Sequence, residues 1–230
     1  MRSEAVARLR GLGFADADAR TLAEHFLDAE ARGKAGHGLS RIDWLATLPE
    51  LDPEARAERG VTEPCFERWA GRGAVGYLTL AAICDAQLAA PPEHARLIVA
   101  AECFPTGVLG YWVRRLAEGG LVAVLTATSP PRLGHPEGGP KLAGTNPLAI
   151  GVPSSDGRPL VADVSMGRVT WGDVISGDAS EDELVPFGGE QAHKAFALAL
   201  GLQLLVARPE ADPVPGLRAR AAGVRLPGDG

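Results

Sequence analysis

The stretch RLIVAAECFPTGVLGYWVRRLAEGGLVAVLT, residues 96–126, decides the fold class. Its two ends, Arg96–Ala101 and Leu121–Thr126, are short apolar runs of the kind that form buried strands. Between them, Gly107–Gly119 has the apolar spacing of a helix. A strand, a helix and a strand at this spacing predict a βαβ-like unit and therefore an α/β fold.

Further strands and helices are expected on both sides of this unit. Toward the C-terminus, Pro147–Val152 and Leu160–Val164 are predicted to be strands and Gln191–Val206 a buried helix. The stretch Gly167–Phe187 between them is polar and is expected to be irregular. Toward the N-terminus, helical spacing predicts a helix pair ending near residue 33, then helices over about 40–48 and 77–89.

The composition is that of an acidic globular chain. Of its 230 residues 46% are hydrophobic, and 23 Lys and Arg against 29 Asp and Glu give a net charge of −6. A general nucleic-acid binder carries the opposite balance of charge, so no nucleic-acid partner is expected. The apolar runs are too short to span a membrane, and the first residues lack the apolar core of a signal peptide. Three cysteines without CxxC spacing argue against a disulfide framework and fit a reducing cytoplasm.

His37 and Arg41 form the most informative pair of residues. His37 lies between two glycines in the turn GKAGHG, residues 33–38, and Arg41 follows four positions later. Around a helix start this spacing puts both side chains on one face, where they can point into one cleft. An imidazole can pass a proton near neutral pH, and a guanidinium binds a carboxylate. The pair therefore suits a substrate with a carbonyl or hydroxyl beside a carboxylate, although a surface histidine in a flexible turn fits the spacing too.

A second glycine-rich turn, Gly71–Gly76, matches the GxGxxG pattern and opens an apolar helix. A Rossmann dinucleotide site also needs a buried strand before the turn and an acidic residue about 20 positions later. Glu93 is available for the second role, but Cys65–Ala70 is too polar for a central parallel strand. The alternative is a glycine turn that allows close packing.

Three further places carry residues suited to a site. The turn Gly144–Pro147 precedes a strand and could cradle a phosphate or amide group, although an ordinary Asn-Pro turn fits as well. Asp163 closes an apolar strand, where it is either a site carboxylate or a turn residue. His193 and Lys194 begin an apolar helix, either near an anion or simply solvated. No metal site is expected, because partners at ligand spacing are missing for His25, His94 and His135.

Taken together, these segments resemble the type-2 malate/L-lactate dehydrogenase family. DAEARGKAGHGLSRI, residues 28–42, is similar to the family's lead-in to its SHGxxR motif. GGPKLAGTNPLAIGVP, residues 138–153, is similar to its GTNP motif, and PFGGEQAHKAFALAL, residues 186–200, to its LGG…HKGYGLAL helix. The family also contains sulfolactate and ureidoglycolate dehydrogenases and cyclic-ketimine (piperideine/pyrroline-2-carboxylate) reductases.

The resemblance implies an activity, a fold and a partner. The activity is hydride exchange between NAD or NADP and C2 of a small 2-oxo, 2-hydroxy or 2-imino acid. The fold is α/β, a mixed sheet with flanking helices that binds NAD(P) without a Rossmann unit, which disfavours the dinucleotide interpretation of Gly71–Gly76. Family members are typically homodimers, so a homodimer is expected.

The resemblance also assigns roles to single residues. The family's general acid/base histidine falls on His37 and its substrate-carboxylate arginine on Arg41. Asp163 falls on the position of a carboxylate near the site and is expected to share in catalysis. The expected cofactor-binding residues are Thr126, Gly144, Thr145, Asn146 and Lys194.

The sequence departs from the family pattern at several positions. The serine that usually precedes the histidine is Gly36, and the HFG motif is Pro105-Thr106-Gly107, without its histidine. The chain is also shorter than family members usually are. A degenerate, non-catalytic member that acts as a binding or assembly subunit is therefore the alternative to an active oxidoreductase.

The organisation along the chain is expected to have three parts. Residues 1–60 form an N-terminal helical segment with the His-Arg motif, and residues 61–208 an α/β cofactor-binding core. Residues 209–230 are expected to pack back on that core as a C-terminal tail.

Overall fold

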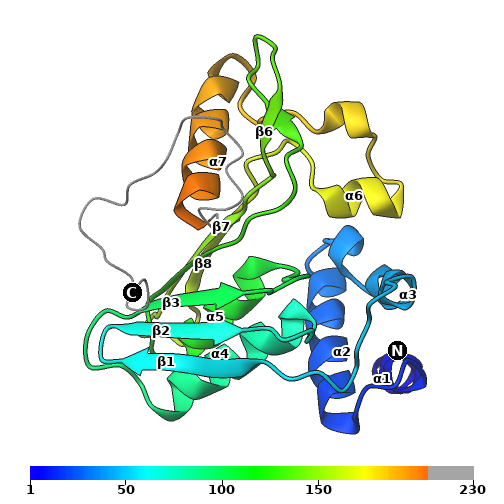
Figure 1. Ribbon diagram of the computed structural model, residues 1–230, viewed down its shortest axis with the longest axis vertical. Coiled ribbons are helices and arrows are strands. Elements are labelled where there is room, and N and C mark those ends of the chain that lie inside the picture. The colour runs from blue at the N-terminus through cyan, green and yellow to red at the C-terminus, as the bar shows by residue number, and fades with distance from the viewer. Residues whose placement is uncertain (207–230) are drawn as a thin grey trace, which may run out of the picture. The chain divides into compact units, whose positions relative to one another are not determined.

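A computed structural model describes residues 1–206 of the chain (Figure 1). The chain divides into two compact units. The first unit comprises Met1–Leu125, Leu148–Val164 and Gly172–Ser180, and the second comprises Thr126–Pro147, Ser165–Trp171 and the described residues from Glu181 onward. The expected tail 209–230 lies outside the described residues, and the three-part division of the chain stays a prediction.

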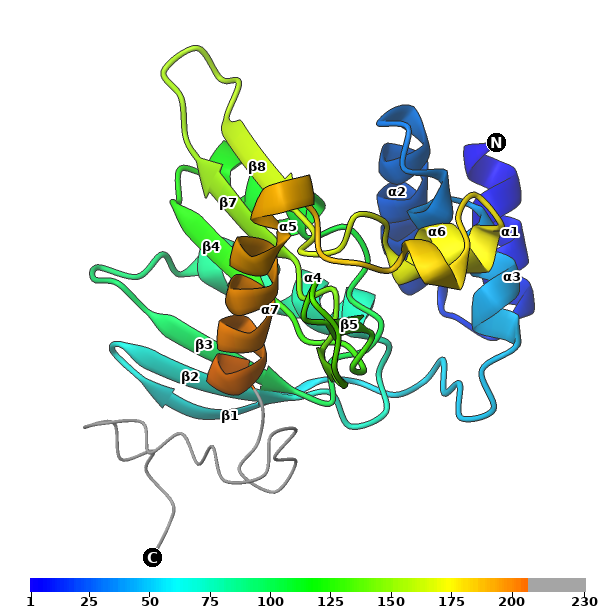
Figure 2. The same ribbon diagram turned by 90° about the horizontal axis from the view of Figure 1, so that it is seen from above.

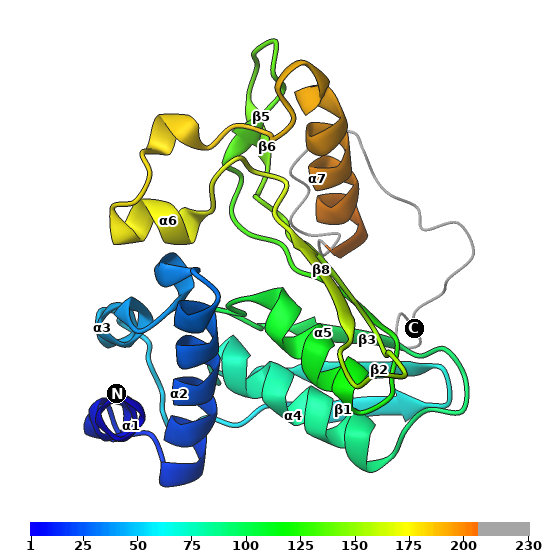
Figure 3. The ribbon, with the colours of Figure 1, turned by 180° about the vertical axis from the view of Figure 1, so that it is seen from behind.

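The first unit begins with four short helical elements: α1 Arg2–Gly11, α2 Asp16–Ala31, η1 Ala35–His37 and α3 Ser40–Ala46. Each α-helix turns its apolar positions inward, and Leu9, Phe26 and Leu45 are fully buried. These helices match the elements expected from helical spacing. Figure 3 shows α1 beside α2, so the turn that follows α2 is anchored to a packed helix pair.

The first sheet has the strand order β1-β2-β3. Its strands are β1 Glu58–Glu63, β2 Phe66–Ala70 and β3 Leu97–Ala101, and α4 Gly76–Ala89 lies between β2 and β3 in the chain. Strand β2 is antiparallel to β1 and parallel to β3. The βαβ unit of this fold is therefore β2–α4–β3. The prediction that it spans residues 96–126 was wrong, because β3 and the next strand, β4, belong to different sheets.

The central strand β2 carries a buried carboxylate, Glu67, which is fully enclosed. Arg59 and Arg96 form ion pairs with Glu67, the second at 2.8 Å. The N–H groups of Trp69 and Gln87 donate to its other oxygen at 3.0 and 3.1 Å. A buried charge is tolerated when it is paired and hydrogen-bonded. The expectation that this segment is too polar for a central parallel strand was therefore wrong.

The second sheet has the order β4-β7-β8, from β4 Ala123–Thr126, β7 Leu148–Val152 and β8 Leu160–Val164. Strands β7 and β8 are antiparallel. Helix α5 Leu109–Glu118 packs on them, as Figure 2 shows, and lies beside α4 (Figure 3). Val152, Leu160 and Val164 on these strands are exposed. Parallel and antiparallel pairing with flanking helices confirms the predicted α/β class.

The second unit contains the hairpin β5 Leu133–Gly134 and β6 Lys141–Ala143, the 3₁₀ turns η2 Glu181–Glu183 and η3 Gly189–Gln191, and α7 Ala192–Val206. Helix α7 packs against β6. It was expected to be a buried helix, but only one face is buried, and Leu198 and Leu205 are exposed.

The stretch 167–187, expected to be irregular, contains the helix α6 Trp171–Ser176. Its first residue belongs to the second unit and the remaining residues to the first. Within residues 1–206, no helix combines the length and apolarity needed to cross a bilayer. The same residues contain no group of three or more His, Cys, Asp or Glu placed to hold a metal ion.

Candidate active site

A tight turn after α2 positions the candidate catalytic histidine. Gly33 takes a left-handed conformation with φ +72°, which a glycine adopts without strain. The chain then enters η1, where the His37 N–H donates to the Lys34 carbonyl at 2.9 Å. The N–H of Arg41, in the first turn of α3, donates to the Gly38 carbonyl at 3.0 Å. Two successive short helical turns therefore place His37 and Arg41 close together.

His37 and Arg41 converge on the backbone at the start of α6. A Cβ atom added to Gly172 would lie 2.6 Å from His37 Cε1 and 2.8 Å from Arg41 Nη2. Arg41 as a whole is 7% exposed, and its Nε donates to the Gly36 carbonyl at 2.7 Å. The guanidinium also lies 4.9 Å from the centre of the Trp44 ring. The structure thus brings together the two side chains that the sequence singled out.

The environment of His37 keeps its imidazole neutral. Burial, followed by the charge of Arg41, lowers the pKa of His37 from 6.5 to about 4. Lys34 lowers the pKa further, whereas the carboxylates of Asp173 and Asp163 raise it. At neutral pH this side chain is therefore a proton acceptor, which suits a general base.

Asp163 is held beside this pair from β8. Its Oδ2 accepts an ion-paired hydrogen bond from Lys34 Nζ at 2.8 Å. On the other side it lies against the first turn of α5, where a Cβ atom at Gly110 would approach Oδ2 to 2.9 Å. Only a residue without a side chain allows this contact. Asp163 is therefore fixed between a lysine and the first turn of a helix.

A layer of aromatic side chains lies behind the His37 turn. His25, on α2, is fully buried, stacks on Trp112 with ring centres 5.3 Å apart, and meets Tyr77 edge-on at 4.9 Å. Its Nε2 accepts the Val108 N–H at 3.1 Å. Burial lowers the pKa of His25 from 6.5 to about 3 and raises that of Tyr77. His25 thus fixes the chain entering α5 as a neutral imidazole.

The segment that departs from the family's HFG motif retains its glycine for a steric reason. Gly107 has φ +68°, and any Cβ there would collide with the rings of His25 and Tyr77. The backbone at Gly107 therefore packs directly on the buried aromatic layer.

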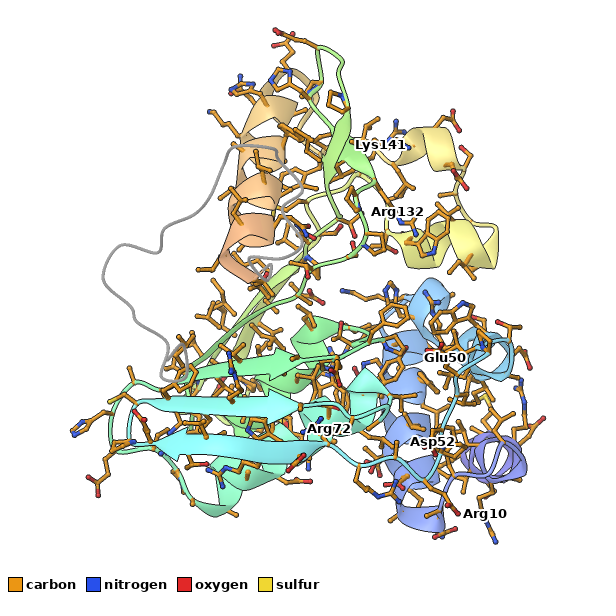
Figure 4. The ribbon with its side chains drawn as sticks, in the orientation of Figure 1. Arg10, Glu50, Asp52, Arg72, Arg132 and Lys141 are labelled. Carbon is orange, nitrogen blue, oxygen red and sulfur yellow. The ribbon has the colours of Figure 1, made fainter. Side chains whose placement is uncertain are left out.

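The turn Gly71–Gly76 is filled by the chain's own backbone. It does follow a strand, β2, and opens α4. A Cβ at Gly71 would collide with the Glu102 carbonyl, and one at Gly76 would lie 2.6 Å from the Pro105 carbonyl oxygen. Arg72, labelled in Figure 4, pairs with Glu58 at 2.9 Å. The glycines serve close packing, the alternative to a dinucleotide site.

In the second unit, the turn 144–147 is held by hydrogen bonds. Asn146 is fully buried, and its Nδ2 donates to the Ala199 carbonyl at 2.8 Å and to Gln203 Oε1 at 2.9 Å. Its Oδ1 accepts the Ser129 N–H at 3.1 Å. Both donors of Asn146 are therefore used within the protein, so this side chain shapes the turn. Its expected cofactor contact stays a prediction.

The other predicted cofactor-binding residues lie around the same turn or on α7. The Thr145 N–H donates to Ser129 Oγ at 3.2 Å, and Thr126 Oγ1 donates to the Pro147 carbonyl at 2.9 Å. A Cβ at Gly144 would collide with Ser129. Lys194 is exposed in the first turn of α7. These contacts describe the residues within the protein, and their roles in cofactor binding stay predictions.

Arg132 gives the second unit a place for an anionic group. Its guanidinium stacks on the Trp171 ring, with Cζ 3.4 Å from the ring centre. The buried Nε atom of Arg132, labelled in Figure 4, finds no hydrogen-bond acceptor among the described residues. An unsatisfied buried donor of this kind fits a carboxylate or a phosphate. The residues present therefore fit a phosphate-bearing cofactor.

Sequence reasoning missed Lys34, Asp173, Arg132 and the buried His25. Lys34 was visible as a lysine in the same turn as His37, but its partner Asp163 lies far along the chain. Asp173 lies in the segment expected to be irregular, and its charge acts on both His37 and Arg41. Spacing within one segment cannot report contacts of this kind.

Known proteins identify the family of this chain. The family model described as malate/L-lactate dehydrogenase matches residues 1–189, most of the chain. The chain belongs to the malate/L-lactate dehydrogenase family. This confirms the resemblance and the expected fold type.

Relatives within the malate/L-lactate dehydrogenase family have names that describe different substrates. The chain is 31% identical to a (2R)-3-sulfolactate dehydrogenase (NADP(+)) of Chromohalobacter salexigens, over 91% of this chain and 60% of that protein. It is 29% identical to a Delta(1)-pyrroline-2-carboxylate/Delta(1)-piperideine-2-carboxylate reductase of Pseudomonas aeruginosa, over 89% and 69%. These relatives are oxidoreductases. The chain spans 60% of the length of the first.

A solved structure shows the same fold. A dehydrogenase from Sinorhizobium meliloti matches with a TM-score of 0.76 and 26% sequence identity, over 90% of this chain and 68% of that one. The arrangement of mixed sheets and helices described above is thus the fold of this dehydrogenase family.

Proposed function

We propose that this chain transfers a hydride between NAD or NADP and C2 of a small 2-oxo, 2-hydroxy or 2-imino acid. The observation that carries the proposal is the convergence of His37 and Arg41 beside the partly buried Asp163. Relatives named for a 2-hydroxy acid and for cyclic imino acids support this substrate class.

Arg41 would bind the carboxylate of the substrate. Its Nε donates to the Gly36 carbonyl, and its guanidinium lies over the Trp44 ring. These two contacts hold the guanidinium in one orientation. A planar guanidinium held in this way recognises a carboxylate through paired N–H groups. The substrate's C2 would then lie near His37, because the two side chains share one face of the turn.

His37 would move the proton at the substituent on C2. In the direction of oxidation its neutral imidazole accepts the hydroxyl or amine proton. In the direction of reduction it must first be protonated. A substrate carboxylate on Arg41 offsets the charge that lowers the pKa of His37. Binding of the substrate therefore raises the pKa of His37 and prepares it to donate a proton.

When bound, the nicotinamide supplies the hydride donor or acceptor that the side chains of this chain lack. Gly144 and Thr145, in the turn that Asn146 shapes, would contact the cofactor. Thr126, Lys194 and Arg132 would also bind it, the last two through charge. Asp163 would assist catalysis by stabilising the protonated form of His37.

Spectroscopic assays test this proposal. NADH and NADPH binding is measured first by thermal shift, and then oxidation at 340 nm with a panel of 2-oxo acids, with and without methylamine, to separate C=O from C=N substrates. His37→Gln is expected to lower turnover by about 100-fold or more. Lys141→Met, an exposed change on β6 (Figure 4), is the matched control. If His37→Gln retains the full rate, the assigned proton carrier is wrong.

A non-catalytic binding or assembly subunit is the second candidate. The observation that favours it is the absence of a histidine at Pro105–Gly107. It predicts that neither NADH nor NADPH raises the melting temperature and that no 2-oxo acid is reduced. A thermal shift together with turnover excludes this candidate.

We also propose that the chain acts in the cytoplasm as a homodimer. Exposed Val152, Leu160 and Val164 on β7 and β8 support a self-association surface. Light scattering after size exclusion measures the mass directly. A monomer mass at all concentrations contradicts the dimer.

A further inference from the structure

Lys34 connects the turn of His37 to a distant strand. Its carbonyl accepts the His37 N–H at 2.9 Å, so its backbone belongs to the catalytic turn. Its ammonium lies 2.8 Å from Asp163 Oδ2 on β8. One residue therefore joins the turn, through a charged contact, to the carboxylate that acts on His37.

This ion pair differs from the many surface pairs of the chain. The Asp163 side chain is only 15% exposed and is enclosed on its far side by Gly110 in α5. Exposed pairs contribute little, whereas a carboxylate removed from water depends on its partner. Without Lys34, Asp163 would retain a poorly solvated charge that acts on His37.

We propose that Lys34 is a positioning residue for the reaction of His37. It holds Asp163 against α5 and sets the balance of charge around the imidazole. This inference rests on the proposed function of His37 as proton carrier.

The charges around His37 come from several elements. Arg41 on α3 and Lys34 before η1 are cationic, and Asp163 on β8 and Asp173 on α6 are anionic. His25 on α2, behind the turn, is neutral. Two cations and two anions thus surround the imidazole. Removing the Lys34 ammonium leaves one cation against two carboxylates, and the protonated imidazole becomes more favourable.

A titration of His37 tests the proposal without any substrate or cofactor. The full chain is labelled with ¹³C-histidine, and the His37 Cε1–H signal is assigned by its loss in His37→Gln. Lys34→Met is expected to move the titration midpoint of His37 upward by about one pH unit. Lys34→Arg, which keeps the cation, and the exposed control Lys141→Met are expected to titrate like the wild type. If Lys34→Met does not fold, Lys34→Gln removes the charge but keeps a hydrogen-bond donor for Asp163.

An unchanged midpoint in the neutral variants overturns the proposal, whether or not the protein turns over a substrate. If the wild type turns over no substrate but the His37 midpoint shifts in the neutral Lys34 variants, the proposed function is contradicted. The coupling of Lys34 to His37 is then still supported. In active protein, the pH profile of kcat/KM is expected to move with the His37 midpoint in Lys34→Met, while KM for the acid stays within about twofold. A rise of KM of tenfold or more, with the pH profile in place, makes Lys34 a substrate ligand and overturns its positioning role.

Discussion

Mild acid is expected to destabilise this protein through its buried imidazoles, and His25 offers the clearest case. The pKa of His25 is about 3 in the folded chain and 6.5 when exposed. Between pH 6.5 and pH 3 the unfolded chain is protonated at His25, whereas the folded chain is not. The free energy of unfolding therefore falls as the pH falls from 6.5 toward 3. At pH 5 the loss from His25 alone is about 2 kcal/mol relative to pH 8. His37, with a pKa of about 4, adds a similar loss.

The combined loss is a large part of the 5 to 15 kcal/mol that stabilises a typical domain, roughly 4 kcal/mol at pH 5. Urea unfolding at pH 8 and pH 5, followed by circular dichroism, measures it. His25→Gln, whose amide oxygen can still accept the Val108 N–H, does not titrate. It is expected to lose about 2 kcal/mol less than the wild type between these pH values.

The exposed His94 supplies the matched control, because His94→Gln is expected to follow the wild type. The comparison uses the difference between pH values within each variant, so a general destabilisation by the substitution cancels. Equal losses in the wild type and His25→Gln would refute the argument that His25 is held neutral.

Three further substitutions probe separate contacts. Arg41→Met is expected to raise KM for the acid by about 100-fold with little effect on the KM of NADH or NADPH, because it removes a charge-assisted pair. Steady-state kinetics measures both constants. A change in the cofactor KM alone argues against Arg41 as the residue that binds the substrate carboxylate. Gly36→Ser is expected to destabilise the fold by about 1 to 3 kcal/mol, because the serine Cβ would lie 2.8 Å from the Gly172 carbonyl carbon. An unchanged midpoint of urea unfolding would show that the turn relaxes. Asn146→Ala removes the donor to the Ala199 carbonyl and the acceptor for the Ser129 N–H, and is expected to cost about 1 to 3 kcal/mol. A melting temperature equal to that of the wild type contradicts this.

The elements that sequence predicted well depend on local patterns. Apolar spacing located α1, α2 and α3, and short apolar segments located β7 and β8. Strand pairing is a long-range property, so the pattern in residues 96–126 gave the elements but assigned their partners wrongly.

Buried charge explains another error. Strand β2 was considered too polar because Glu67 was judged without its partners. Arg59 lies on β1 and Arg96 directly precedes β3. A carboxylate is compatible with a central strand only when such partners arrive from elsewhere in the chain.

The candidate site shows the same division between local and distant information. Four positions along a helical turn were enough to place His37 beside Arg41. The contact of Lys34 with Asp163 joins distant segments, and no local spacing reports it. Local spacing thus singled out the candidate pair, whereas the charges around it required the fold.

The close approach of Gly36 to Gly172 has a consequence for how this chain could have diverged. Each glycine occupies the space that a side chain on the other would need, since a Cβ at either position meets the backbone of its counterpart at 2.8 Å. A serine next to His37 is therefore expected to displace the start of α6. Among close homologues, the residues at these two positions are expected to covary.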